Sequence, residues 1–76
     1  MEETNEEIIA RLTKLAEKQE ANKEYERAFL NYVAILMRNP KDKETAIKAD
    51  NLMFEIGSSG KYHNIYQVIC KIIIDS

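Results

Sequence analysis

One stretch of the chain, from Ala21 to Pro40, constrains the fold more than any other. Its apolar residues recur at steps of three and four, which places them on one face of a helix: Tyr25, Ala28, Phe29, Tyr32, Ile35 and Leu36. Asn22 is a candidate N-cap, because its side-chain oxygen can accept from a free backbone N–H. Proline disfavours the helical conformation in the residue before it. The sequence therefore predicts a helix over residues 23–38 that closes at Asn39.

A second helix is expected before this stretch. Thr4 and Glu7 have the S/T-x-x-E spacing of a capping box and precede a run of periodic apolar residues. The pattern predicts a helix over residues 5–20, whose apolar face carries Ile8, Leu12, Leu15, Ala16 and Gln19. Because the link to residue 23 is short, these two helices should lie antiparallel.

A third helix is expected over residues 43–56. Asp42 is its candidate N-cap, and Gly57 can supply the left-handed residue that ends many helices. Its apolar face carries Ala46, Ala49, Leu52, Met53 and Ile56. A turn is predicted at Ser58, Ser59 and Gly60.

The last segment, residues 62–74, is apolar around most of its circumference, with Ile65, Tyr66, Val68, Ile69, Cys70, Ile72, Ile73 and Ile74. A helix of this kind is buried on most sides, yet a four-helix protein of this size can hardly bury its last helix so completely. We therefore expect it to face a second copy of the chain, with Tyr66, Ile69 and Ile73 at the interface. A β-branched strand over residues 65–74 is the alternative.

These segments predict a single all-α domain over residues 1–76, built as four antiparallel helices in two stacked hairpins. The net charge is −2 with both signs interspersed, which argues against a general binder of nucleic acid or of anionic membranes. One cysteine permits no internal disulfide and fits a reducing, cytoplasmic compartment. From the acidic first residues and the lack of a long apolar run, we expect no signal peptide and no membrane-spanning segment.

An internal repeat supports the two hairpins. A shift of 37 residues superposes the halves of the chain and pairs Leu12 with Ala49, Leu15 with Leu52, Ala16 with Met53, Gln19 with Ile56, Tyr25 with Tyr62, Ala28 with Ile65, Tyr32 with Ile69 and Ile35 with Ile72. The matched positions are those expected in the core.

Residues 9–42 resemble the tetratricopeptide repeat, a 34-residue helical hairpin. The positions that match its pattern are Leu12, Leu15, Ala16, Tyr25, Ala28, Tyr32 and Pro40. Ile35 stands where the family has a small residue, and Lys23 stands where it usually has glycine. Residues 43–76 match fewer positions, because Met53 and Ile65 replace small residues and the spacing is three residues longer. A plain four-helix bundle is the alternative.

The resemblance implies protein binding, without catalysis, on a concave surface lined by the first helix of each hairpin. Carried over by position, the surface comprises Ala10, Thr13, Lys14, Glu17, Ile47, Asp50, Asn51 and Phe54, of which Thr13, Lys14, Glu17, Ile47, Asn51 and Phe54 are the candidate partner-binding residues. The family's carboxylate-binding clamps use Lys and Asn at such places, so Glu17 disfavours a C-terminal carboxylate ligand. Independently, Ile47 and Phe54 lie off the main apolar face of their helix. They are either anchors for a partner or packing against the first helix.

Few residues of this sequence are candidates for catalysis or metal binding. His63 and Cys70 are separated by about 10.5 Å along a helix, which is too far for a proton-transferring pair or for binding one metal ion. No glycine-rich phosphate loop and no nucleophile elbow occurs. We therefore expect no enzyme, no cofactor and no metal.

Three hypotheses for the function follow. The leading one is a small protein-interaction module, such as an adaptor, a small chaperone or a co-regulatory subunit. An acidic inhibitor or immunity-type protein is the second, because residues 1–27 hold eight Glu against five Lys or Arg; the acidic residues Glu2, Glu3, Glu6 and Glu7 can also simply complement the helix dipole. The third is a structural homo-oligomer built on residues 62–74.

Overall fold

The computed structural model describes residues 4–57 and 62–75. These residues form four helices, α1 (Asn5–Ala21), α2 (Tyr25–Arg38), α3 (Lys43–Ile56) and α4 (His63–Asp75). The all-α class is confirmed. The alternative of a strand over residues 65–74 is wrong, because those residues lie within α4.

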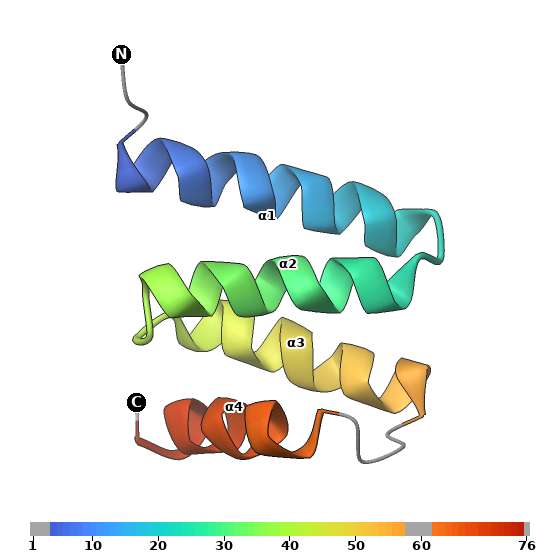
Figure 1. The fold of residues 1–76 in the computed structure, drawn as a ribbon, viewed down its shortest axis with the longest axis vertical. Coiled ribbons are helices and arrows are strands. Elements are labelled where there is room, and N and C mark those ends of the chain that lie inside the picture. Colours follow the sequence, from blue (N-terminus) through green and yellow to red (C-terminus); the bar gives the residue numbers. More distant parts are fainter. Residues whose placement is uncertain (1–3, 58–61, 76) are drawn as a thin grey trace.

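The helices lie antiparallel in sequence order, and each packs against the next (Figure 1). The molecule is flat, with extents of 40 × 31 × 18 Å. The two inner helices, α2 and α3, therefore have a helix on either side, whereas α1 and α4 lie at the two ends of the array. This difference in the number of neighbours decides which apolar faces are covered.

Four of the predicted helix ends are confirmed. Asn39 is the C-terminal cap of α2, and its N–H donates to the Ile35 carbonyl at 2.9 Å. Thr4 Oγ1 accepts a hydrogen bond from the Glu7 N–H at 3.2 Å and caps α1. At α3, Asp42 Oδ1 accepts from the Thr45 N–H at 3.1 Å and Oδ2 accepts from the Thr45 hydroxyl at 2.8 Å. Gly57 ends α3 in the left-handed conformation, with φ of 70°.

The prediction that Asn22 caps the N-terminus of α2 is wrong. Asn22 is the C-terminal cap of α1, and its N–H donates to the Lys18 carbonyl. α2 begins at Tyr25, and Glu24 before it makes no side-chain capping bond. Because α1 extends through Ala21, the link is too short for Asn22 to serve the second helix. The predicted turn at residues 58–60 and the acidic residues Glu2 and Glu3 lie outside the described residues.

The core runs through all four helices. Its buried apolar members are Ala16, Ala28, Phe29, Tyr32, Ile35, Leu36, Ala46, Ala49, Leu52, Met53 and Ile69. Four alanines of α1, α2 and α3 are fully buried, Ala16, Ala28, Ala46 and Ala49, and small side chains at such places permit close packing of helices. The rings of Phe29 and Tyr62 lie 5.1 Å apart and connect α2 with the residue that precedes α4.

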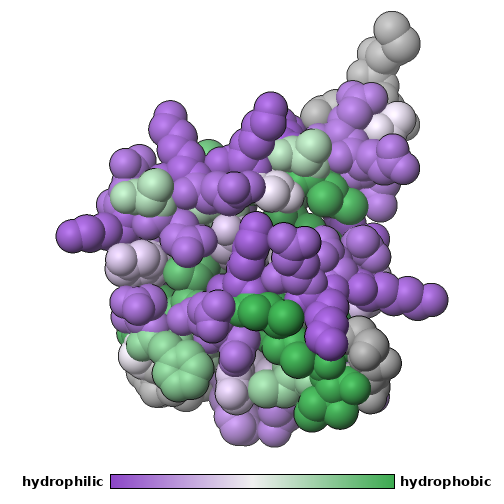
Figure 2. All heavy atoms as spheres, turned by 180° about the vertical axis from the view of Figure 1, so that it is seen from behind, coloured by the Kyte–Doolittle hydropathy of each residue, from purple (hydrophilic) through white to green (hydrophobic). Residues whose placement is uncertain are grey.

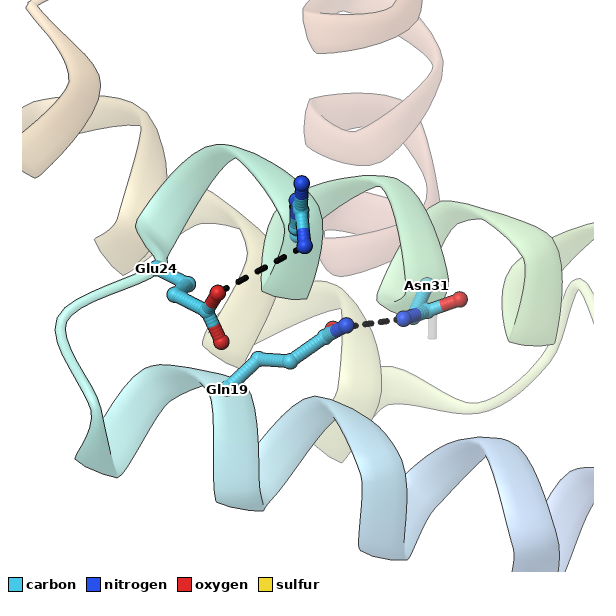
Figure 3. A network of polar contacts seen from close by, with 4 residues as sticks. Gln19, Glu24 and Asn31 are labelled. Atoms are coloured by element: carbon cyan, nitrogen blue, oxygen red, sulfur yellow. Dashed lines mark hydrogen bonds and ion pairs between the residues drawn. The ribbon is translucent and has the colours of Figure 1, made fainter.

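Polar contacts join α1 to α2 at the end of the first hairpin (Figure 3). The Asn31 amide donates to Gln19 Oε1 at 2.6 Å, and the Tyr32 hydroxyl donates to Glu20 Oε1 at 3.0 Å. Burial, followed by the bond to Glu20 and its negative charge, raises the pKa of Tyr32. Glu24 forms an ion pair with Arg27 at 3.5 Å, but both groups are exposed and such pairs contribute little. Both of the hydrogen bonds between α1 and α2 are partly buried and add to the apolar packing between these helices.

The prediction that Leu15 lies on a covered face of its helix is wrong. Its side chain is 43% exposed, whereas Leu52, which is 37 residues later, is 2% exposed. The reason is the number of neighbours: α3 lies between two helices, whereas α1 packs chiefly on α2.

Candidate interaction surface

Large apolar side chains are exposed on the second hairpin. Phe54 on α3 is 79% exposed, and Val68 and Ile74 on α4 are 58% and 79% exposed. Figure 2 shows that hydrophobic side chains gather along the lower edge of one face of the molecule, over α3 and α4. Exposed aromatic and aliphatic side chains that gather in this way are typical of protein-interaction surfaces.

Phe54 lies at the edge of an open hollow of about 350 Å³ between α3 and α4. The hollow is lined by Met53, Phe54, Gly57 and Tyr66. These four residues are called the α3–α4 surface below. A Cβ atom built on Gly57 would meet no atom within 4 Å, so this corner of the hollow has free space.

Polar groups lie beside the hollow. Asp50, one turn before Phe54 on α3, has a buried Oδ1 atom without a hydrogen-bond partner among the described residues. The neighbouring Cys70 thiol raises the pKa of the Tyr66 hydroxyl, and the negative charge of Asp50 raises it further. Tyr66 therefore keeps its proton and remains a hydrogen-bond donor near neutral pH. The hollow therefore has the Tyr66 phenol among its lining residues, with the Asp50 carboxylate close to that phenol.

The residues predicted to form one partner-binding groove lie in different places. Thr13 is half-buried, and its hydroxyl donates to the Ile9 carbonyl at 2.8 Å. Lys14 lines a separate hollow on α1 with Glu7, Ala10 and Arg11. Glu17 is exposed and faces a hollow shared with Lys48 of α3. The structure therefore brings Glu17 to Lys48, a residue that the sequence analysis did not single out.

The predicted residues of α3 lie on its outer side. Asn51 is exposed, Ile47 is 42% exposed and Phe54 is 79% exposed. The alternative that Phe54 packs against the first helix is wrong, because so exposed a ring is covered by no helix. Phe54 instead lies beside Tyr66 of α4 at the hollow.

One of the residues predicted for the interface between copies belongs to the core. Ile69 is 1% exposed, so assigning it to an intermolecular surface is wrong; α3 packs over this side of α4 within the chain itself. Tyr66 and Ile73 are half-buried and keep part of their surface accessible. Met53 is 5% exposed, which confirms its predicted place on the apolar face of α3, and it forms the inner side of the hollow. Gly57 was predicted only as a helix end, so its place in the lining of the hollow was not expected.

Comparisons with the models of known protein families, with curated proteins and with solved structures find no match to this chain. Among the described helices, none is long and apolar enough to cross a membrane. Residues 4–57 and 62–75 also contain no group of three or more His, Cys, Asp or Glu side chains arranged to hold a metal ion.

Proposed function

We propose that this chain is a small protein-interaction module that binds a partner protein through the α3–α4 surface. The observation that carries the proposal is the position of Phe54, which is 79% exposed at the edge of an apolar hollow. Aromatic side chains that enter or border pockets supply much of the energy of protein interfaces. The proposed roles are those of an adaptor, a small chaperone or a co-regulatory subunit.

The size of the chain supports the same proposal. A domain of 76 residues has a small core, and the balance of apolar burial against conformational entropy is close to zero at this length. Burying a phenylalanine contributes about 1.5–3 kcal/mol, so covering Phe54 on a partner would add to a narrow margin of stability.

The test is capture of partners from the native host with the intact chain, followed by measurement of the affinity of the identified partner. Phe54→Ala should weaken binding at least about tenfold, equivalent to ~1.4 kcal/mol. Met37→Ala is the matched control, because Met37 is 81% exposed but lies on α2, away from the α3–α4 surface. Thr13→Glu tests the groove implied by the family resemblance. If Phe54→Ala and Met37→Ala have equal effects, the α3–α4 surface is not where the partner binds.

Assembly of identical copies on α4 is the second candidate, favoured by the exposure of Val68 and Ile74, 58% and 79%. Sedimentation would then show a dimer or larger species, and Ile73→Lys would shift it toward the monomer. A chain that is monomeric across the accessible concentration range, and whose Ile73→Lys variant remains folded and soluble, would exclude this candidate.

A further inference from the structure

The last helix is covered on few sides by the rest of the chain. α4 lies at the end of the array (Figure 1) and packs chiefly on α3. Among the side chains of α4 whose burial the structure describes, only Ile69 is buried. An element with little buried surface can open locally while the rest of a protein remains folded. A contact that joins α4 to a second helix therefore affects how often α4 opens.

Tyr62, the residue directly before α4, makes such a contact with α2. Its ring lies 5.1 Å from the ring of Phe29, which is 0% exposed, at an interplanar angle of 53°. The Tyr62 hydroxyl donates a hydrogen bond to Glu26 Oε1 at 2.5 Å. A tilted aromatic pair and a hydrogen bond to a carboxylate are both stabilising. These two contacts of Tyr62 with Phe29 and Glu26 are called the Tyr62 clasp below.

The backbone connects the Tyr62 clasp to the first turn of α4. The Tyr66 N–H donates a hydrogen bond to the Tyr62 carbonyl at 2.8 Å. While this turn is formed, the position of Tyr62 against α2 therefore fixes where α4 begins. The hollow described above depends on the same arrangement, because Tyr66 lies on α4 whereas Met53, Phe54 and Gly57 lie on α3 or at its end.

We propose that the Tyr62 clasp controls the opening of α4, so that its release lets α4 separate from α3 as a unit while α1, α2 and α3 remain folded. The hollow is lost in the open chain, because Tyr66 moves away with α4. The clasp thus regulates whether the α3–α4 surface is assembled. Only the use of that surface by a partner rests on the proposed function; the opening of α4 does not.

The single cysteine of the chain allows opening to be measured without a partner. Cys70 lies on α4 and is half-buried, and its thiol is hydrogen-bonded with the Tyr66 hydroxyl. An aromatic disulfide reagent reacts with this thiol faster when α4 opens and exposes it. The rate at which the intact chain is labelled therefore reports the opening of α4.

Two matched variants test the hydrogen bond of the clasp. Tyr62→Phe keeps the ring but removes the hydroxyl, so labelling of Cys70 should become about threefold to tenfold faster, as expected for the loss of one hydrogen bond. Tyr25→Phe makes the same change at the equivalent position 37 residues earlier and should leave the rate unchanged. Glu26→Ala should also accelerate labelling. Tyr62→Phe should then add nothing, because the two changes remove one shared bond.

Hydrogen exchange of backbone amides distinguishes local opening from unfolding of the whole chain. In Tyr62→Phe, the amides of α4 should exchange faster by the factor found for Cys70, and the amides of α1 and α2 should keep their wild-type rates. Equal acceleration in all four helices would mean that Tyr62 stabilises the whole fold, and the clasp would be overturned. An unchanged labelling rate in Tyr62→Phe, or additive effects with Glu26→Ala, would overturn it as well.

A further measurement separates this inference from the proposed function. A partner that binds the assembled α3–α4 surface should slow the labelling of Cys70, because binding draws the chain toward the closed form. A partner that binds without slowing the labelling would overturn regulation through this surface and the surface itself as the binding site. The clasp would still be supported by labelling and exchange of the chain alone.

Discussion

The turn between α1 and α2 contains a non-glycine residue in the left-handed conformation. Lys23 has φ of 65°. Its N–H donates to the Glu20 carbonyl, and the Glu24 N–H donates to the Gln19 carbonyl, which is the bonding pattern of a Schellman motif at the end of a helix. Glycine is preferred at this position of the motif. We therefore predict that Lys23→Gly stabilises the protein.

The magnitude follows from the backbone. The left-handed conformation costs a residue with a Cβ atom about 1–2 kcal/mol, and glycine removes that cost. Glycine also gives the unfolded chain more freedom, which offsets about 0.4–1 kcal/mol. The Lys23 side chain is exposed, so its removal should change little else. The net gain in the free energy of unfolding should be about 0.5–1 kcal/mol, or about 2–8 °C in Tm.

Thermal unfolding followed by circular dichroism measures this gain, with two further variants as comparisons. Gly57→Ala should destabilise the protein by about the same amount, because Gly57 has φ of 70° and a Cβ atom there meets no neighbour within 4 Å. Lys23→Ala retains a Cβ atom and should give no gain. If Lys23→Ala stabilises the protein as much as Lys23→Gly, the side chain and not the backbone is responsible, and the reasoning is refuted.

Three further predictions concern the core, a helix cap and the dependence on pH. Ile69→Ala should lower the free energy of unfolding by about 2–5 kcal/mol in urea denaturation, and a loss as small as that of an exposed residue would contradict its place in the core. Asp42→Ala removes the acceptor of the Thr45 N–H and should cost about 0.5–2 kcal/mol in the same assay; Asp42→Asn, which keeps an oxygen acceptor, should cost less. Burial and Glu20 raise the pKa of Tyr32 above its ordinary 10.0. As the pH rises, the Tyr32 hydroxyl therefore loses its proton first in the unfolded chain, and the free energy of unfolding should fall above about pH 10. The fall should be smaller in Tyr32→Phe. An equal pH dependence in both chains would contradict a raised pKa of Tyr32 in the folded protein.

The helix ends could be predicted from sequence because they depend on groups close together in the chain. Thr4 and Asp42 each accept a hydrogen bond from a residue three positions later. Gly57 adopts the left-handed conformation, which glycine tolerates better than other residues. Asn22 shows the limit of this reasoning. A residue in a short link can serve the helix before it or the helix after it, and where the first helix actually ends decides between them.

The candidate site was predictable only in part. Phe54 stood out in the sequence because it lies off the periodic apolar face of its helix. The hollow beside it could not be predicted, since it depends on how α4 lies against Met53, Gly57 and the end of α3. The presence of Glu17 and Lys48 at the same hollow likewise depends on the relative placement of α1 and α3, which the sequence pattern does not specify.

By itself, the sequence determined that this chain forms four helices and which face of each is apolar. Only the tertiary structure decided how far each face is covered, as Leu15 and Leu52 demonstrate at equivalent positions with 43% and 2% exposure. The physical reason is that periodicity depends on the geometry of one helix, whereas burial depends on the neighbours that pack against it. α2 and α3 have a neighbour on either side, and the ends of the array at α1 and α4 do not.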